Sequence, residues 1–161
     1  MSKRGRIGLF GVGLDTYWPQ FAGLKDRLTG YQDYIAGRLS ALGAEVLNAG
    51  LVDSPEAARR AAERFAAGRV EMIFLYIATY ALSSTVLPVA QRVGVPIVVL
   101  NLQPVPAIDY ERFNSLGDRG LMTGEWLAHC QACCAPEIAN VFNSCGIEYN
   151  LVTGWLEEEY A

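Results

Sequence analysis

Short apolar runs alternate with amphipathic stretches along this chain. Runs of nearly continuous apolar character are typical of strands covered on both faces. They span residues 6–10, 44–48, 70–77, 97–100 and 149–152. The stretches between them repeat apolar residues at steps of three and four, which indicates helices. Strands alternating with helices at this spacing predict an α/β fold, a Rossmann-like open parallel sheet flanked by helices.

Two helix starts carry local signals. Ser54 can cap a helix, and Pro55 after it has the fixed φ of a first helical residue. A second helix is expected to begin after the third strand, with Ser83 or Ser84 as its cap. Both signals place a helix between consecutive strands, as a parallel sheet requires.

The second half of the chain is predicted to be less regular. Residues 101–120 contain two prolines and two glycines and are expected to form a long loop. Pro136 is expected to divide the next segment, 124–146, into two helices. We therefore predict a Rossmann-like domain at 1–121, followed at 122–161 by a helical segment and the first strand of a second, truncated domain.

Composition and charge restrict the class of protein. The 161 residues, 52% of them hydrophobic, suit one globular domain with a sizeable core. A net charge of -4 gives no reason to expect nucleic acid as a partner. Residues 72–91 carry no charge, but hydroxyls, an amide and a proline crowd the second half, which favours a strand, loop and helix over a membrane span.

The loop after the first strand begins with Gly11 and Gly13. A dinucleotide-binding fingerprint needs a third glycine and a helix that opens directly after the strand. Thr16 holds the third position here, and Pro19 delays the helix. Nucleotide binding is therefore the less favoured interpretation of this loop.

Ligands of open parallel sheets bind beyond the carboxyl ends of the strands. The predicted loops there combine hydroxyls, amides, a few carboxylates and aromatic rings. They carry Asp15, Tyr17, Trp18 and Gln20, then Thr79, Tyr80 and Ser83, then Asn101, Gln103, Asp109 and Asn114. This mixture suits a neutral polyhydroxylated ligand, whereas a phosphorylated one would need Arg, Lys or a helix N-terminus. The alternative is that the aromatic residues are loop anchors packed over the sheet edge.

All four cysteines lie close to the only histidine. They are Cys130, Cys133, Cys134 and Cys145, and the histidine is His129. So tight a group disfavours a secreted disulfide scaffold and favours a cytoplasmic protein. A zinc or iron–sulfur site lacks its second ligand pair, so packing of small apolar thiols along one helix face is favoured. His129 is either a structural residue or a hydrogen-bonding or proton-transfer group at a site.

Five segments carry a resemblance to a known family. They are GVGLDTYWPQF (11–21), AGLVDSPEAA (49–58), ATYALSSTVLPVA (78–90), VVLNLQP (98–104) and GEWLAHCQACCAPEIANVFNSCGI (124–147). On these motifs, which span nearly the whole sequence, the chain resembles the N-terminal portion of the L-fucose isomerase and L-arabinose isomerase superfamily. The resemblance is specific to the superfamily and leaves the substrate open.

Enzymes of that superfamily interconvert aldoses and ketoses by proton transfer between C1 and C2, with Mn²⁺ or another divalent metal. The resemblance implies a homo-oligomer in which this domain lines a neighbour's active site. It makes Asp15, Tyr17, Trp18 and Gln20 substrate-side candidates. His129 is similar in place to a histidine lent across the subunit interface, although the Cys-Gln-Ala-Cys-Cys that follows differs from the family motif.

The family's metal ligands and acid–base residues lie in later domains, beyond Ala161, so we assign neither catalytic nor metal-binding residues here. The expected function is the N-terminal part of a metal-dependent sugar isomerase that encloses substrate and is inactive alone, with the metal held only by the full-length enzyme. The alternatives are a non-catalytic sugar-binding or regulatory domain and a cysteine-based metal module. The predicted substrate-binding residues are Asp15, Tyr17, Trp18, Gln20, Thr79, Tyr80, Asn101, Gln103 and His129.

Overall fold

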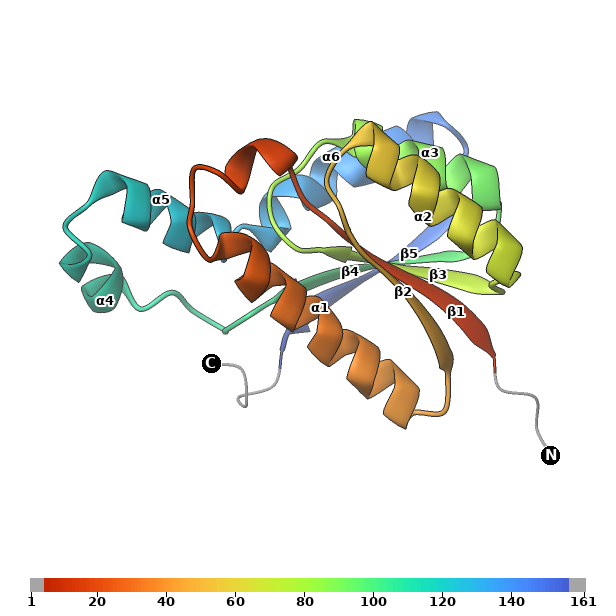
Figure 1. Cartoon of the computed structure of the whole chain (residues 1–161), viewed down its shortest axis with the longest axis horizontal. Coiled ribbons are helices and arrows are strands. Elements are labelled where there is room, and N and C mark those ends of the chain that lie inside the picture. The colour runs from red at the N-terminus through yellow and green to blue at the C-terminus, as the bar shows by residue number, and fades with distance from the viewer. Residues whose placement is uncertain (1–4, 157–161) are drawn as a thin grey trace.

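Five parallel strands form one sheet with helices on both faces in the computed structural model, which describes residues 5–156 (Figure 1). The strands are β1 (Arg6–Val12), β2 (Glu45–Val52), β3 (Met72–Ile77), β4 (Ile97–Gln103) and β5 (Tyr149–Trp155). The helices are α1 (Leu24–Ala41), α2 (Pro55–Gly68), α3 (Ser83–Val93), α4 (Tyr110–Ser115), α5 (Arg119–Leu127) and α6 (Gln131–Ser144), with a short 3₁₀ helix η1 (Asp15–Tyr17). The predicted Rossmann-like α/β fold is confirmed.

The strand order is β2-β1-β3-β4-β5, and every neighbouring pair is parallel. The chain moves outward from β1 to β2 and then returns past β1 to β3. Helix α1 lies on one face of the sheet, whereas α2, α3 and α6 lie on the other (Figure 1). The loops after β1 and β3 therefore leave toward opposite faces, which opens a crevice between them at the carboxyl edge.

Strand β3 explains why the apolar runs are continuous. Ile73, Leu75 and Ile77 point into the core cluster under α2, α3 and α6. Phe74 and Tyr76 point to the opposite face, into the cluster under α1. Because both faces of the strand are covered, alternation between apolar and polar residues is lost. The uncharged run 72–91 divides into β3, a loop and most of α3, and no helix within the described residues is long and apolar enough to cross a membrane.

Helix α6 runs unbroken through Pro136, so the predicted division at this proline is wrong. The break lies before α6, where Cys130 has a non-helical backbone and caps the helix. Pro136 removes one backbone hydrogen bond. Burial of Cys134, Ile138 and Phe142 against the sheet compensates for this loss.

Residues 101–120 are more regular than predicted. Strand β4 continues to Gln103, α4 spans Tyr110–Ser115, and α5 begins at Arg119. An aspartate caps each helix: Asp109 Oδ1 accepts from the Arg112 N–H at 3.0 Å, and Asp118 Oδ1 accepts from the Leu121 N–H at 2.8 Å. Side-chain caps of this kind stabilise short helices that lack a strong apolar stripe.

The two predicted helix starts have different outcomes. Ser54 caps α2, because its Oγ accepts from the Ala57 N–H at 3.3 Å. Neither Ser83 nor Ser84 caps α3. The carboxylate of Glu137, from α6, accepts from the Ser83 N–H at 2.8 Å instead. A distant side chain thus supplies the acceptor that the local sequence suggested would come from serine.

The segment 131–155 is joined to the same sheet. Strand β5 pairs in parallel with β4 along its whole length, from Ile97 beside Tyr149 to Gln103 beside Trp155. Helix α6 packs on the face that also holds α3. The domain boundary after residue 121 stays a prediction, and residues 157–161 lie outside the described part of the chain.

We expect Gly11→Ala to destabilise the protein by about 1–3 kcal/mol, because a Cβ there would collide with the buried Gln32 side chain and lie 2.8 Å from Leu51. The matched control is Gly37→Ala on α1, where a Cβ meets nothing within 4 Å. That change should stabilise by about 0.5–1 kcal/mol. Urea unfolding of both variants measures the difference, and equal effects would contradict the packing argument.

Candidate functional site

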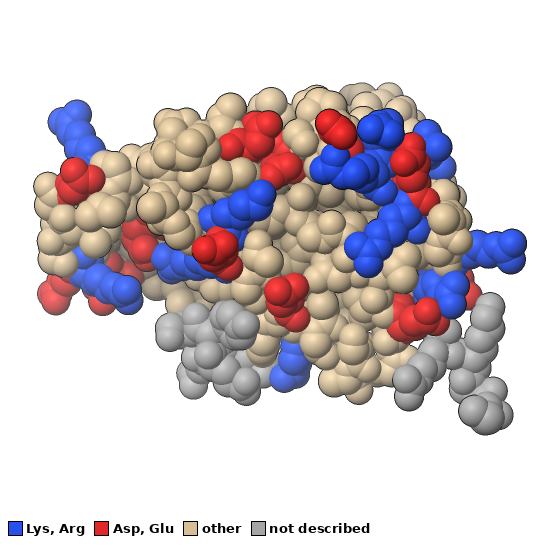
Figure 2. Space-filling model, viewed as in Figure 1, with Lys and Arg blue, Asp and Glu red and all other residues tan. Residues whose placement is uncertain are grey.

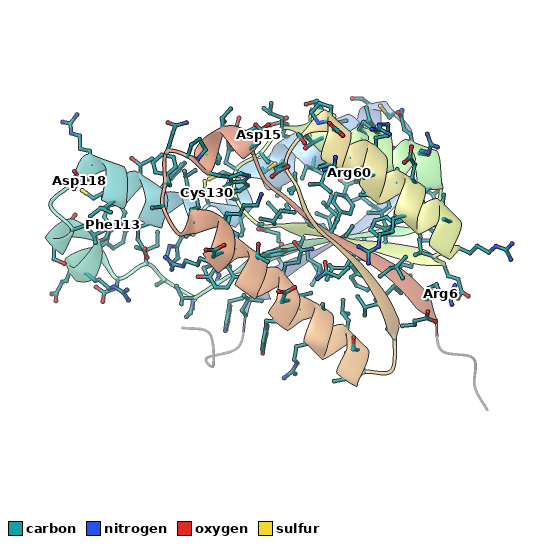
Figure 3. The ribbon with its side chains drawn as sticks, viewed as in Figure 1. Arg6, Asp15, Arg60, Phe113, Asp118 and Cys130 are labelled. Atoms are coloured by element: carbon teal, nitrogen blue, oxygen red, sulfur yellow. The ribbon has the colours of Figure 1, made fainter. Side chains whose placement is uncertain are left out.

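The crevice lies at the carboxyl ends of β1 and β3. The segments at this edge are the loop 13–23, the loop 78–82 and the junction 128–130 between α5 and α6, and hydrogen bonds of Thr79 and Gln131 join the last two. Figure 3 shows Cys130, at this junction, behind the loop that carries Asp15. The chain reverses direction across the sheet at this point, which is the usual place for a ligand in this strand order.

Aromatic side chains from the first loop form one wall. Tyr17 packs edge-on against Trp18 and Phe21, with ring centroids 6.4 and 6.1 Å apart. Trp18 Nε1 donates to Asp53 Oδ2 at 2.7 Å. Lys25 lies 5.4 Å from the Trp18 ring and 3.4 Å from the same carboxylate oxygen. Trp18 is therefore held in place from the end of β2, with its indole N–H already occupied.

Tyr17 also faces the loop after β3. Partial burial raises the pKa of the Tyr17 hydroxyl, and the neighbouring Tyr80 and Cys130 raise it further. Tyr17 thus remains a neutral hydroxyl at neutral pH. Tyr80 is 36% exposed. Trp18 lies beside Tyr17 on the first loop, and the effect of Tyr80 on the Tyr17 pKa indicates that the loop after β3 is near them. Substrate binding by these three residues stays a prediction.

A cavity of about 440 Å³ adjoins this wall, between the first loop and α5. Gln20 and the ion pair between Arg27 and Glu125 line it. Gln20 Nε2 donates to the Thr16 carbonyl at 2.5 Å, which leaves its side-chain oxygen as an acceptor. Asp15 is exposed at the start of η1.

The ion pair was not visible in the sequence. Arg27 Nη1 and Nη2 donate to the two carboxylate oxygens of Glu125 at 2.6 and 3.3 Å, and Arg27 Nε donates to the Tyr31 hydroxyl at 2.6 Å. Partial burial raises the pKa of Glu125, but the hydrogen bonds and charge of Arg27 outweigh it and hold the pKa below its usual range. The partners are 98 residues apart, so no local pattern could have paired them.

Three more of the predicted substrate-binding residues, outside the first loop, make internal hydrogen bonds. Thr79 is buried, and its hydroxyl donates to the Leu127 carbonyl at 2.6 Å. Gln103, with its amide oriented to satisfy both atoms, donates to Gln131 Oε1 at 2.9 Å and accepts from the Ala132 N–H at 3.0 Å. Asn101 is buried and lies 3.4 Å from the Thr153 hydroxyl. These side chains fasten the end of β4 and the loop after β3 to the segments beside them.

His129 belongs to the same junction. Its Nδ1 lies 2.8 Å from the Glu125 carbonyl and 3.6 Å from the Glu125 carboxylate. Donation from Nδ1 to the carbonyl leaves Nε2 as the acceptor of the ring. The side chain is only 8% exposed in this chain. His129 is thus linked through Glu125 to Arg27 at the cavity wall.

The cysteines do not form a metal site with their neighbours. Cys134 Sγ donates to the Ala81 carbonyl at 3.0 Å, and all four thiols are free. Within residues 5–156, no three His, Cys, Asp or Glu side chains lie close enough together to hold a metal ion. The residues present therefore do not fit a divalent metal centre or a cysteine-based metal module.

Charged side chains are intermixed on the face seen in Figure 2. The densest group of basic side chains there lies over α2 (Figure 2). Within it, Arg60 lies 3.0 Å from Glu56, and Arg59 lies 3.5 Å from Glu63. Nearby carboxylates thus offset the positive charge of this helix.

Neither a protein-family model nor a curated protein matches this sequence. The resemblance to the L-fucose and L-arabinose isomerase superfamily therefore rests on the five motifs alone and stays a prediction.

We expect Arg27→Met and Glu125→Gln to show a coupling free energy of about 1 kcal/mol at pH 7 in a double-mutant cycle of unfolding. Because the pKa of Glu125 is lowered in the folded state, its stabilisation is complete above the ordinary glutamate pKa of about 4.3. The coupling should decline as the pH falls through the lower folded value.

The matched control for this cycle is the exposed pair Arg59 and Glu63 on α2. Its coupling should not exceed about 0.5 kcal/mol, because solvent and salt screen exposed helix pairs. A coupling between Arg27 and Glu125 that is no larger than the control, or that does not change with pH, would contradict the assignment.

Proposed function

We propose that the crevice binds a neutral polyhydroxylated sugar, and that this chain is the N-terminal part of a metal-dependent aldose–ketose isomerase. The observation that carries the proposal is the aromatic wall of Tyr17, Trp18 and Phe21 at the reversal of strand order, near the loop that carries Tyr80. In this role the chain encloses the substrate and contributes subunit contacts of a cytoplasmic homo-oligomer.

The side chains at the crevice have the chemistry that a sugar needs. The aromatic faces of Tyr17 and Trp18 suit the C–H faces of a sugar ring. The hydroxyls of Tyr17 and Tyr80 can both donate and accept, and Gln20 Oε1 accepts. Sugar hydroxyls can therefore find neutral partners among these side chains.

The charges around the crevice argue against a phosphorylated ligand. Two basic side chains beside the first loop, Lys25 and Arg27, are already paired with Asp53 and Glu125. A phosphate group would have to displace one of these carboxylates before it could gain a counter-charge. A neutral ligand avoids this cost.

The described residues supply binding and enclosure, and no chemical step follows from them. Since they do not fit a divalent metal, the Mn²⁺ of an isomerase would be held by residues outside this chain. His129 is the residue that we propose reaches a neighbouring subunit's site, with Nε2 as its hydrogen-bonding atom.

A non-catalytic sugar-binding or regulatory domain is the second candidate. It would use the same crevice, and like the isomerase fragment it needs no metal-ligand group within residues 5–156. The intact mass of the product of the native gene separates the two. A mass well above 17.6 kDa supports the isomerase, and a mass equal to it supports the binding module.

We expect the purified chain to bind L-arabinose or L-fucose with a dissociation constant of ~1 mM in isothermal titration calorimetry. This constant corresponds to a binding free energy of about -4 kcal/mol. Tyr17→Ala should weaken this binding about fivefold or more, because an aromatic wall and a hydroxyl are lost. The matched control is Tyr110→Ala on α4, whose ring is 69% exposed and does not line the crevice. Equal affinity of both variants, or no sugar binding by the unaltered chain, contradicts a sugar crevice.

The purified 161-residue chain should show no isomerase turnover with L-arabinose or L-fucose when Mn²⁺ is added, because its described residues form no metal centre. Ketose formation is measured directly, with a chelator-treated sample as the control. Mn²⁺-dependent turnover by this chain would overturn our assignment of the metal and acid–base residues to other segments.

A further inference from the structure

Two cysteines lie three positions apart at the start of α6. Cys130 is the capping residue, with φ -98° and ψ 30°, and Cys133 is the third residue of the helix. The two thiols are near enough for Cys133 to raise the pKa of the Cys130 thiol. Cys130 is buried, with 2% of its surface exposed, whereas Cys133 is exposed. The pair therefore combines a buried thiol with a solvent-exposed one.

The backbone at this point is compatible with a bond between the two sulfurs. Residues three apart on a helix have Cβ atoms about 5–6 Å apart, and a disulfide needs about 3.5–4.5 Å. Cys130 lies outside the regular helix, so small changes in its φ and ψ can close this gap without breaking the hydrogen bonds of α6.

We propose that Cys130 and Cys133 are a redox-modification site that forms a reversible intramolecular disulfide by exchange with a small-molecule disulfide. This proposal does not depend on the proposed sugar function. It assigns a chemical role to two side chains that the crevice alone does not explain.

The exchange balances in two steps. The Cys133 thiolate attacks one sulfur of the small disulfide, whose S–S bond breaks and releases one small thiolate. Cys130 then loses its proton to solvent and attacks Cys133 Sγ, which forms the protein S–S bond and releases the second small thiolate. The two cysteines are oxidised, and one small disulfide is reduced to two thiols.

Burial sets the order of these steps. The Cys130 thiol is desolvated, which raises its pKa, although the nearby Tyr80 backbone lowers it slightly. Cys130 therefore stays protonated at neutral pH and is a poor first nucleophile. The exposed Cys133 reacts first, and Cys130 resolves the mixed disulfide because it lies three positions away at the start of the same helix.

The other two cysteines are less suitable partners. Cys134 is buried, its thiol is engaged by the Ala81 carbonyl, and it is adjacent to Cys133 in the chain. Cys145 is exposed just beyond the opposite end of α6. Cys145 is therefore a matched control, since it is also exposed but lies at the end of α6 away from the other three cysteines.

The test uses the Cys145→Ser protein, so that the accessible but isolated thiol is removed. After incubation with oxidised glutathione and alkylation under denaturing conditions, two of the three remaining thiols should be lost without retained glutathione. Dithiothreitol should restore them. Fragment-ion mapping should locate the link between Cys130 and Cys133, and Cys134→Ala in the same background should retain it.

Two further variants make the outcome decisive. Cys130→Ala, in the same background, should retain one glutathione on Cys133, and Cys133→Ser should neither lose two thiols nor gain a stable adduct. If the parent protein gives only a glutathione adduct, or its link maps to Cys133 and Cys134, the proposal is overturned. Mapping on the parent protein decides the question even where a variant fails to fold.

Discussion

The close approach of both helix layers to strand β1, which lies between β2 and β3, is the constraint on which the rest of the structure depends. Three glycines make it possible. A Cβ at Gly8 would lie 3.0 Å from the Phe65 ring of α2, and one at Gly11 would collide with Gln32 of α1. At Gly13 a Cβ would lie 3.0 Å from the Trp18 ring. The strand lacks side chains where helices from both faces, and then the aromatic loop, come nearest to it.

The crevice follows from this arrangement. Because Gly13 carries no side chain, Trp18 can fold back over the end of β1 and donate to Asp53 at the end of β2. This bond fixes the first loop to the neighbouring strand. Tyr17 is then directed toward Tyr80 on the other side of the strand reversal. The aromatic wall is a consequence of how the sheet edge packs, and the loop sequence by itself does not produce it.

The junction between α5 and α6 is bound to the loop after β3 by three hydrogen bonds. Thr79 donates to the Leu127 carbonyl, Gln131 donates to the Ala78 carbonyl, and Cys134 donates to the Ala81 carbonyl. Each of these bonds connects residues about fifty positions apart. They hold the segment that contains Cys130 beside the loop that carries Tyr80.

The sequence by itself determined the strands, most of the helices and the parallel direction of the strands. These features depend on local patterns of apolar residues and on caps such as Ser54. It also directed attention to Tyr17, Trp18 and Tyr80, because polar and aromatic residues after buried strands meet at one sheet edge. Only the tertiary structure decided that Arg27 pairs with Glu125 and that Glu137 caps α3. Those contacts join residues far apart in the chain, and their energy depends on packing and burial that no local pattern records.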